Sequence, residues 1–418
     1  MPEAVDVVVI GMGVGGEAVA GSLAKEGLSV VGVERELVGG ECPYWGCIPS
    51  KMMIRAANAI AEARRVPGLA GAADVRPDWA PVAARIRAEA TDTWDDKVAV
   101  DRFTDQGGTF VRGEGRIVAP GRVAVGDREF EATRAIVIGS GTTAAIPPVA
   151  GLADSPYWTN RDAVETEQVP ASLAVLGGGA IGVELAQAFS RFGAQVTVIE
   201  AMDRILPLEE PESSEVVASV FAGDDLDPLA GEHGGEGIEV IAGSGATNVS
   251  HGPGGFAIQI GDAATVEAER LLVATGRRAD PGAVGLDAIG VKGERWVPAD
   301  EFLRVAPGVW AVGDVTGAGA FTHVATYQAR IVVDDILGRS PDPADYRALP
   351  RVTFTDPEVG SVGMTEAQAR DAGLSVRVGT ASVPSTARGW IHKAGNEGLI
   401  KVIEDAARGV LVLSLIHI

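Results

Sequence analysis

The sequence predicts an α/β protein with two doubly wound, Rossmann-like domains followed by a smaller α+β domain. Three observations support this prediction. A short apolar run, a glycine-rich turn and a helix-forming stretch occur in the same order at two places in the chain. The 418 residues exceed what one hydrophobic core usually serves, so two or three domains are expected. After Pro350 the pattern changes to short, separated strands.

The first repeat opens the chain. Residues 6–10 form an apolar run typical of a buried parallel strand, and a helix is expected over 17–26 and a second strand over 28–33. Between the first strand and the helix lie Gly11, Gly13 and Gly16, spaced as G-x-G-x-x-G. Such a turn lets a backbone approach a pyrophosphate at the N-terminus of a helix.

An acidic residue, Glu34, ends the second strand of this repeat. A carboxylate at this position can accept hydrogen bonds from ribose hydroxyls. Glycine-rich turns alone are common, but here the turn lies between a strand and a helix and an acid comes after them. This context favours dinucleotide binding.

The second repeat has the same parts, with a strand over 171–176, a helix over 183–192 and a strand over 195–199. Gly177, Gly179 and Gly182 form its turn, and Glu200 ends its second strand. A carboxylate there suits a free ribose 2′-OH and repels a 2′-phosphate, which favours NAD over NADP. Arg204 could weaken this preference, and Glu200 could instead be only a solvated strand end.

The remaining elements are less regular. Pro147, Pro148 and Gly151 mark a boundary before the second repeat. We expect a helix over 82–100, short strands over 109–134, a strand and turn over 135–141, a surface loop over 224–237, strands at 271–276 and 309–314, a helix over 321–337, and antiparallel strands that include 352–355 and 398–403.

Composition excludes several classes of protein. Hydrophobic residues make up 46% of the chain and charged residues 22%, which is typical of a globular protein and not of a disordered one. The net charge of −22 opposes binding to nucleic acid and to anionic membranes. No apolar run reaches the length of a membrane span, and the N-terminus shows no signal peptide, so we expect a cytoplasmic protein.

The two cysteines form the most specific pattern in the sequence. Cys42 and Cys47 are the only cysteines, and a structural disulfide across so short a loop would restrict the unfolded chain little. The pair is therefore interpreted as redox-active in a reducing compartment. Lys51 adds a positive charge one helical turn after Cys47. The alternative, two buried unpaired cysteines, does not explain the glycines before the pair or Ile48–Lys51 after it.

Several segments together resemble one known family. The chain is similar to the class I pyridine nucleotide-disulfide oxidoreductases, such as dihydrolipoyl dehydrogenase, glutathione reductase and mercuric reductase. The resemblance keeps the order of the chain through Gly11–Gly16, Cys42–Lys51, Gly177–Glu184, Ala274–Arg277, Gly313–Asp314 and Pro350–Glu358. It implies an FAD that exchanges electrons with a nicotinamide nucleotide, NAD or less favourably NADP, and a homodimer that acts on a small or protein-bound disulfide or dithiol.

The resemblance also implies roles for individual residues. Cys47 corresponds to the sulfur nearer the flavin and Cys42 to the interchange thiol. Lys51 corresponds to a lysine near the flavin ring that pairs with Glu184. Further FAD-lining positions are Gly115, Ser140, Asp314 and Thr322, and positions bordering NAD are Ala246, Ala274, Gly276 and Arg277.

The resemblance divides the chain into three domains. It implies an FAD-binding domain over 1–150 and 270–345, an NAD-binding domain over 151–269 and a truncated dimerisation domain over 346–418. The last residues, 413–418, resemble the translation of a sequencing-library adapter. We therefore expect these residues to be non-native and the native end of the chain to be missing.

Two departures from the family leave the substrate open. Pro43–Trp45 replace the commoner residues between the cysteines, and the His–Glu pair that serves the family as acid and base does not occur before residue 418. One alternative is a mercuric-ion or quinone reductase of the same fold. Another is a catalytically silent flavoprotein that serves as a binding module.

Overall fold

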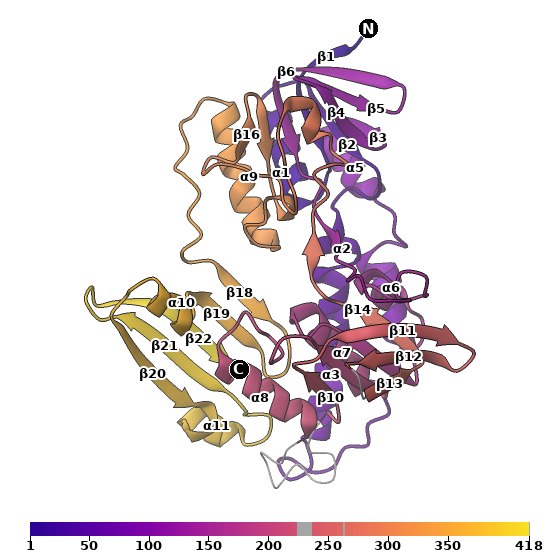
Figure 1. Cartoon of the computed structure of the whole chain (residues 1–418), viewed down its shortest axis with the longest axis vertical. Helices are drawn as coiled ribbons and strands as arrows, with labels where there is room; N and C mark the ends of the chain where they lie inside the picture. Colours follow the sequence, from indigo (N-terminus) through magenta and orange to yellow (C-terminus); the bar gives the residue numbers. More distant parts are fainter. Residues whose placement is uncertain (224–235, 262–263, 418) are drawn as a thin grey trace. The chain divides into compact units, whose positions relative to one another are not determined.

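The computed structural model describes residues 1–223, 236–261 and 264–417 (Figure 1). The chain forms two compact units. The first comprises residues 1–48, 87–143 and 277–346, and the second comprises residues 49–86, 144–276 and 347–418. Most of the acidic loop predicted over 224–237 lies outside the described residues. The bounds of the three domains inferred from the sequence remain predictions.

The first unit contains an eight-stranded sheet whose main path runs β16-β17-β6-β1-β2-β3. β1 pairs in parallel with β2 on one side and with β6 on the other, so Val7 lies opposite both Val30 and Ala135. The strands are β1 (Glu3–Ile10), β2 (Val30–Glu34), β3 (Thr109–Arg112), β4 (Gly115–Ala119), β5 (Arg122–Val125), β6 (Arg128–Ile138), β16 (Arg304–Ala306) and β17 (Val309–Ala311).

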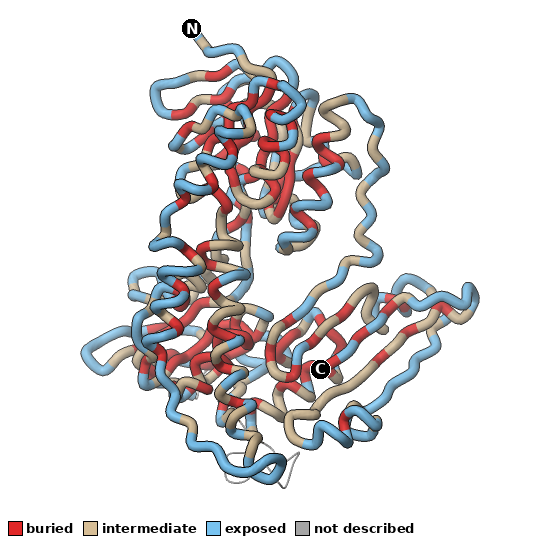
Figure 2. The backbone as a smooth tube through the Cα atoms, turned by 180° about the vertical axis from the view of Figure 1, so that it is seen from behind, coloured by how far each residue is buried: buried red, intermediate tan, exposed pale blue. Residues whose placement is uncertain are grey.

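Both faces of this sheet are buried (Figure 2). Val7 and Val9 of β1 face the core formed with α1 (Val14–Lys25), α5 (Lys97–Asp105) and α9 (Thr322–Ile336). Val8 and Ile10 face the opposite core, which includes β4, β5 and the short helix η3 (Leu286–Ile289). Burial on both faces explains why β1 is apolar without alternation.

The helix predicted over 82–100 is wrong as a single element. The structure has α4 (Ala80–Arg85), a π-helical turn (Ile86–Ala90) and then α5, which starts at Lys97. Between them, Asp92, Thr93 and Trp94 have φ values of 48°, 60° and 57°, in the left-handed region where a right-handed helix cannot continue. Apolar residues recur at helical spacing on both sides, so the spacing alone did not reveal the interruption.

The second unit contains a parallel four-stranded sheet in the order β10-β9-β8-β14. Beside it lies an antiparallel sheet of β11, β12 and β13. The elements are α6 (Asn160–Glu165), β8 (Ser172–Leu176), α7 (Ala180–Arg191), β9 (Gln195–Glu200), α8 (Pro211–Ala222), β10 (Glu239–Ala242), β11 (Ala246–Gly252), β12 (Gly255–Ile260), β13 (Ala264–Ala268) and β14 (Arg270–Val273).

A five-stranded antiparallel sheet completes the second unit, in the order β18-β19-β22-β21-β20. Ala369 of α10 packs on this sheet against Ile403, Leu413 and Leu415. Residues 413–417 thus continue strand β22, and their non-native origin remains a prediction. The elements are β18 (Pro350–Thr353), β19 (Val359–Gly363), α10 (Glu366–Asp371), β20 (Val376–Ser382), α11 (Ala387–His392), β21 (Leu399–Asp405) and β22 (Val410–His417).

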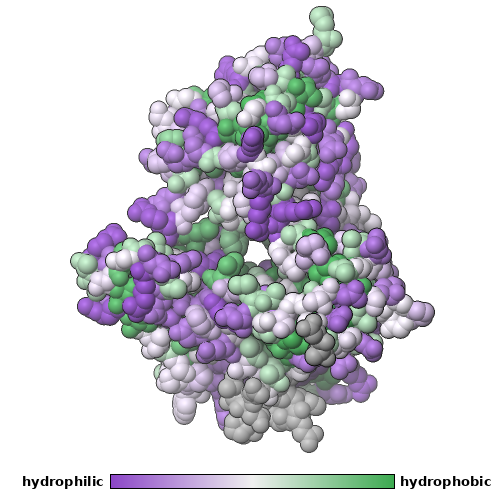
Figure 3. Space-filling model, viewed as in Figure 1, coloured by the Kyte–Doolittle hydropathy of each residue, from purple (hydrophilic) through white to green (hydrophobic). Residues whose placement is uncertain are grey.

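Hydrophilic residues dominate the face shown in Figure 3, with hydrophobic residues scattered among them. None of the helices in the part of the chain that the structure describes is long and apolar enough to cross a bilayer. Short elements not named above are β7 (Thr143–Ala144), β15 (Arg277–Arg278), η4 (Asp314–Thr316) and η5 (Val383–Ser385).

Candidate redox and nucleotide-binding site

The first glycine turn joins β1 to α1 in a conformation that requires glycine. Gly11 has φ of +91°, and a Cβ there would lie 2.5 Å from the Gly139 carbonyl oxygen. A Cβ on Gly16 would lie 1.9 Å from the Gly11 oxygen. Gly13 is different, because it is the N-cap of α1 and its nearest neighbour would be 3.9 Å away, at Gly40. The turn therefore leaves the helix N-terminus open to an anion.

Glu34 lies at the carboxyl end of β2, beside this turn. One carboxylate oxygen accepts the Met12 N–H at 2.8 Å and the other accepts the Glu36 N–H at 2.8 Å. Each oxygen keeps further acceptor capacity, since a carboxylate has about four lone-pair positions. The geometry suits an acid that holds both the turn and a ribose.

The second glycine turn repeats this geometry in the other unit. A Cβ would lie 2.4 Å from the Ala274 oxygen at Gly177 and 2.0 Å from the Gly177 oxygen at Gly182, while at Gly179 it would meet no described atom within 4 Å. Glu200 is buried and accepts the N–H groups of Gly178 at 2.6 Å and Met202 at 2.8 Å.

Arg204 lies four residues after Glu200, and its guanidinium group is occupied by backbone carbonyls. It donates to the oxygens of Leu206 at 2.9 Å, Pro207 at 3.0 Å and Glu209 at 3.0 Å. These contacts shape the loop after β9. They leave Arg204 poorly placed to bind a 2′-phosphate instead.

Three other residues predicted to border NAD lie near the carboxyl ends of these strands, and the fourth, Arg277, lies in the first unit, where it donates to the Thr142 oxygen at 2.7 Å. Ala274 N–H donates to the Leu176 oxygen at 2.7 Å, directly after β14, and the Gly276 oxygen accepts from Ala145 N–H at 2.9 Å. Ala246 begins β11, three residues after Gly243, whose N–H donates to the Met202 oxygen at 2.7 Å. The parallel sheet therefore brings the second glycine turn, Glu200 and Ala274 to one edge.

The cysteine segment is anchored to the first glycine turn by two glycines whose role the sequence alone did not reveal. Gly39 and Gly40 have φ of +110° and +69°. Gly39 N–H donates to the Met12 oxygen at 2.7 Å, and a Cβ on Gly40 would lie 2.9 Å from the Gly13 Cα. The only signal in the sequence was the Gly–Gly pair itself. Close backbone packing thus sets where α2 (Glu41–Tyr44) and α3 (Cys47–Arg64) begin.

The sulfur atoms of Cys42 and Cys47 lie beside one hydroxyl group. Thr322 Oγ1, at the start of α9, donates to Cys42 Sγ at 3.1 Å and lies 3.5 Å from Cys47 Sγ. A hydrogen bond to Cys47 and burial both raise the pKa of the Cys42 thiol. Thr322 was inferred from resemblance to line the FAD, and the structure adds its contact with both sulfurs.

Tyr44 and Trp45 lie between the cysteines in sequence but pack into the interior of the unit. Their exposed fractions are 6% and 8%, and the Tyr44 hydroxyl donates to the Asp95 oxygen at 3.5 Å. Burial raises the pKa of Tyr44 to about 12. The two aromatic side chains therefore pack beneath the cysteine segment in the interior of the unit. They do not form a surface that a substrate could contact.

The remaining predicted flavin-lining residues of the first unit lie around the same turn. A Cβ on Gly11 would lie 2.7 Å from Ser140 Cα, and a Cβ on Gly115 would lie 3.1 Å from an Ile10 methyl carbon. Burial raises the pKa of Asp314, which accepts a hydrogen bond from Thr142 Oγ1 at 3.3 Å. An open helix N-terminus with an acid at the end of the next strand is the donor and acceptor arrangement expected of a dinucleotide site.

Lys51 and Glu184 meet in the second unit, as the resemblance implied. Lys51 Nζ lies 2.7 Å from Glu184 Oε2, and Glu184 Oε1 accepts the Phe354 N–H at 2.9 Å. Within the described ranges, no group of three or more His, Cys, Asp or Glu side chains is placed to hold a metal ion.

Comparison with known proteins agrees with this geometry. A family model described as pyridine nucleotide-disulphide oxidoreductase matches residues 5–329, and a model of that family's dimerisation domain matches residues 349–413. A mercuric reductase of Streptomyces lividans is 33% identical over 97% of this chain and 85% of its own length. A dihydrolipoyl dehydrogenase of Chlorobaculum tepidum is 34% identical over 97% of this chain and 86% of its own length.

Solved structures are similar along nearly the whole chain. The HOCl-induced flavoprotein disulfide reductase RclA from Escherichia coli, solved as a Cu(II) complex, has a TM-score of 0.84 at 26% identity and covers 99% of this chain and 89% of its own. LpdA from Mycobacterium tuberculosis, at 23% identity and a TM-score of 0.83, covers 99% of this chain and 90% of its own and shows the shared fold. The matched models, the relatives and the fold agree. The chain belongs to the pyridine nucleotide-disulphide oxidoreductase family, whose members are flavoprotein enzymes that use FAD and NAD(P)H.

Proposed function

We propose that this enzyme transfers electrons between a nicotinamide nucleotide and a substrate disulfide through Cys42 and Cys47, in the manner of a dihydrolipoyl dehydrogenase. The observation that carries this proposal is that both sulfurs lie within hydrogen-bond distance of the same Thr322 hydroxyl, at 3.1 and 3.5 Å. Bound FAD supplies the electron transfer between the nucleotide and the sulfur pair. The protein holds, orients and protonates the reacting groups.

The environment of the two thiols supports different roles for them. The hydrogen bond between the sulfurs and burial keep Cys42 protonated, because they raise its pKa. Cys42 therefore serves as the donor within the pair, and the negative charge of the reduced pair resides on Cys47. Attack of Cys42 on a disulfide requires a general base to remove its proton, since the thiolate is the nucleophile.

Lys51, Glu184 and the two glycine turns serve the cofactors in this proposal. The turn with Gly11, Gly13 and Gly16 and the acid Glu34 bind FAD, with Gly115, Ser140, Asp314 and Thr322 lining it. The turn with Gly177, Gly179 and Gly182 binds the nicotinamide nucleotide, bordered by Ala246, Ala274, Gly276 and Arg277. Glu200 favours NAD, which is supported by the engagement of Arg204 with three backbone carbonyls.

The assembly and location of the enzyme are part of the same proposal. The dimerisation-domain match supports a homodimer. In that domain, Trp390 and Ile391 expose 77% and 71% of their surface, as residues do when a second copy covers them in the assembly. A reducing compartment such as the cytoplasm suits a cysteine pair that must return to the dithiol state.

The test uses the FAD-loaded protein and the variants Cys42→Ser and Cys47→Ser. Before any NADH is added, the Cys42→Ser protein should already show the long-wavelength absorbance of the Cys47 thiolate next to oxidised flavin, because it has no disulfide to reduce, and Cys47→Ser should lack that absorbance. Both variants should lose turnover of dihydrolipoamide with NAD. Retained dihydrolipoamide turnover in either variant contradicts the proposed pathway.

A metal-ion reductase is the second candidate function. It is favoured by one observation: the identity to a mercuric reductase, 33%, is nearly the same as the identity to a dihydrolipoyl dehydrogenase, 34%, over the same 97% of the chain. NADH oxidation measured with Hg²⁺, Cu²⁺, menadione and lipoamide separates the candidates. Faster turnover of a metal ion than of lipoamide, lost in Cys42→Ser, favours the metal-ion reductase.

A further inference from the structure

Three side chains on one face of α7 hold the segment that comes directly after β18. Glu184, Gln187 and Arg191 are spaced i, i+3 and i+7, and all three are buried. Glu184 Oε1 accepts the Phe354 N–H at 2.9 Å, and Gln187 Oε1 accepts the Asp356 N–H at 2.8 Å. Arg191 reaches Asp356 Oδ2 at 2.8 Å. Later residues of the segment thus meet later residues of α7, so the segment runs along one face of the helix.

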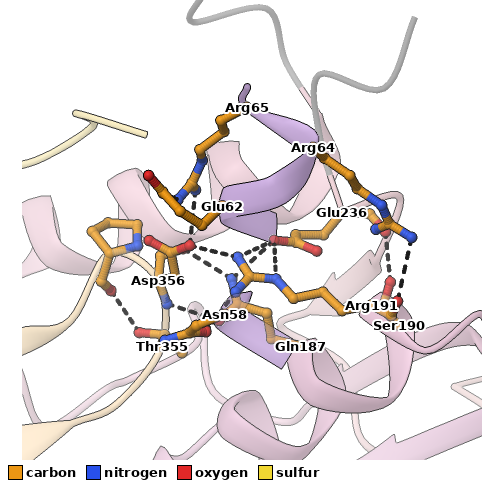
Figure 4. Close-up of polar contacts among 11 residues, drawn as sticks. Asn58, Glu62, Arg64, Arg65, Gln187, Ser190, Arg191, Glu236, Thr355 and Asp356 are labelled. Atoms are coloured by element: carbon orange, nitrogen blue, oxygen red, sulfur yellow. Dashed lines mark hydrogen bonds and ion pairs between the residues drawn. The ribbon is translucent and has the colours of Figure 1, made fainter. Parts of the chain in front are cut away.

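Arg191 is itself held in place from several sides (Figure 4). Its guanidinium group contacts Glu236 at 2.5 Å and Asn58 Oδ1 at 2.6 Å, in addition to Asp356. Arg65 donates to the same Asp356 oxygen at 2.8 Å. Although burial acts to raise it, the pKa of Asp356 is lowered by Arg191 and Arg65. The charges in this cluster are paired and hydrogen-bonded, which restricts the segment to one position.

Phe354 is the side chain that this arrangement presents to Lys51. The Lys51 ammonium nitrogen lies 4.5 Å from the centre of the Phe354 ring and 2.7 Å from Glu184 Oε2. Phe354 also donates its backbone N–H to the other oxygen of Glu184. The ammonium is therefore held by a carboxylate and by an aromatic face, and these two partners are bonded to each other.

We propose that Phe354 is a positioning residue for Lys51, and that the α7 face of Glu184, Gln187 and Arg191 exists to hold Phe354 in that role. The inference rests on the proposed function, in which Lys51 lies near the flavin ring. A cation serves a reacting centre best when it is held in advance and does not reorganise during the reaction. A salt bridge alone leaves a flexible lysine side chain several positions, whereas a carboxylate and a ring together define one.

The first measurement is the rate at which acetic anhydride acetylates Lys51 in the FAD-loaded, full-length protein, monitored by peptide mass spectrometry. Phe354→Leu removes the ring, and Lys51 labelling should rise about fivefold, as expected for the loss of a cation–π contact of ordinary strength. Phe354→Tyr keeps an aromatic face and should label as the unaltered protein does. Lys97, an exposed lysine in the first unit, serves as the internal reference.

The matched control is Arg351→Met. Arg351 also joins the C-terminal sheet to the segment before α8, through Glu209 at 2.6 Å, but it has no part in the α7 face. Its loss should destabilise the protein without changing the labelling of Lys51. Unchanged labelling in Phe354→Leu, or an equal rise in Arg351→Met, overturns the inference.

The second measurement separates this inference from the proposed function. The reduction potential of the bound flavin should fall in Lys51→Met and fall by a smaller amount in Phe354→Leu, because a held positive charge favours the reduced flavin. If Lys51→Met leaves the potential unchanged while Phe354→Leu still raises labelling, the role of Lys51 near the flavin fails and the positioning by Phe354 stands. If Lys51→Met lowers the potential and Phe354→Leu does not, the positioning inference fails.

Discussion

The two glycine-turn repeats are built alike down to individual hydrogen bonds. In each, the residue after the first glycine donates its N–H to the acid that ends the next strand, Met12 to Glu34 and Gly178 to Glu200. In each, the chain then returns to the turn through one further bond of 2.7 Å, from Gly39 N–H to Met12 or from Leu206 N–H to Gly178. The two repeats therefore share the geometry of the turn and the return of the chain to it.

The repeats differ once the chain has returned to the turn. After Gly39, the first repeat continues into the helical turn that carries Cys42 and the helix that begins at Cys47. After Leu206, the second continues into an acidic segment that contains Glu209, Glu210 and Glu212.

Residues of the C-terminal sheet bind this acidic segment. Arg351 contacts Glu209 at 2.6 Å, and the buried ammonium of Lys401 contacts Glu210 at 2.9 Å and Glu212 at 2.8 Å. The same position thus carries the cysteine pair in the first repeat and attaches the C-terminal sheet in the second. The two repeats therefore share the glycine turn and differ in the segment that follows the return of the chain.

The largest expected effect comes from the attachment in the second repeat. Lys401→Met leaves Glu210, which is buried like Lys401 itself, without its counter-charge. Removing one partner of a buried ion pair costs about 3–5 kcal/mol, so the free energy of unfolding should fall by that amount at neutral pH. Urea unfolding of the two proteins measures the difference. Lys97→Met, which breaks an exposed pair with Asp101, is the control and should cost about 0–1 kcal/mol.

The effect of Lys401→Met should depend on pH in a defined direction. Hydrogen bonds from Arg370 and Lys401 lower the pKa of Glu366 below its ordinary value of 4.5. A group with a depressed folded-state pKa stabilises the protein above its unfolded pKa, and that stability is lost as the pH falls through the folded value. The difference between the two proteins should therefore narrow below pH 4.5. A difference that stays constant between neutral pH and about pH 3.5 contradicts the assignment of the effect to this ion cluster.

The local parts of both repeats could be predicted from the sequence. Strand β1, the turn at Gly11–Gly16 and strand β9 are specified by short apolar runs, glycine spacing and a terminal acid, all within about 30 residues. The cysteine pair was found for the same reason. The way in which the cysteine segment is anchored could not be predicted, because the contact of Gly40 with Gly13 depends on how the chain returns to the glycine turn after β2.

The features that were missed depend on distant parts of the chain. The helix predicted over 82–100 is interrupted before α5, whose N-cap is Asp96. The Asp96 carboxylate accepts the Val38 N–H at 2.7 Å and pairs with Arg112. Phe354 was part of a recognised segment, but its role depends on Lys51 and Glu184. No periodicity within one segment reports contacts such as Val38 with Asp96, 58 positions apart, or Glu184 with Phe354, 170 positions apart.

The second prediction tests whether a methyl group destabilises the protein by the same amount in each of the two glycine turns. Gly16→Ala and Gly182→Ala each place a methyl group about as close to a backbone oxygen, at 1.9 and 2.0 Å. Each should cost about 3 kcal/mol, the upper end of the usual cost of overpacking, because backbone cannot move aside as a side chain can. Thermal unfolding and flavin content measure the effects.

The two glycine variants should then differ in the ligand that is lost. Gly16→Ala should lose FAD, and Gly182→Ala should retain FAD but lose saturable binding of NADH. Loss of FAD from both proteins to the same extent would show that the repeats do not bind separate nucleotides.

The smallest expected effect on stability comes from the middle glycine of each turn, and it distinguishes a glycine needed by the fold from one needed by a ligand. Gly13 and Gly179 are extended N-cap residues with negative φ, and a Cβ would meet its nearest neighbour at 3.9 Å in the first case and no described atom within 4 Å in the second. Alanine is a poor N-cap, so each Ala variant should lose about 1 kcal/mol or less of unfolding free energy.

Ligand affinity should respond much more strongly at these two positions. The methyl group would occupy the space through which a pyrophosphate approaches the backbone, so Gly13→Ala should weaken FAD and Gly179→Ala should weaken NADH by at least about tenfold. Isothermal titration of the apoprotein with FAD, and of the FAD-loaded protein with NADH, measures both. Because the ligand-free protein tolerates the methyl group, a large loss of affinity with little loss of stability can arise only from the space reserved for the nucleotide. Equal affinities in variant and unaltered protein would mean that the open helix N-termini of α1 and α7 are not where the pyrophosphates bind.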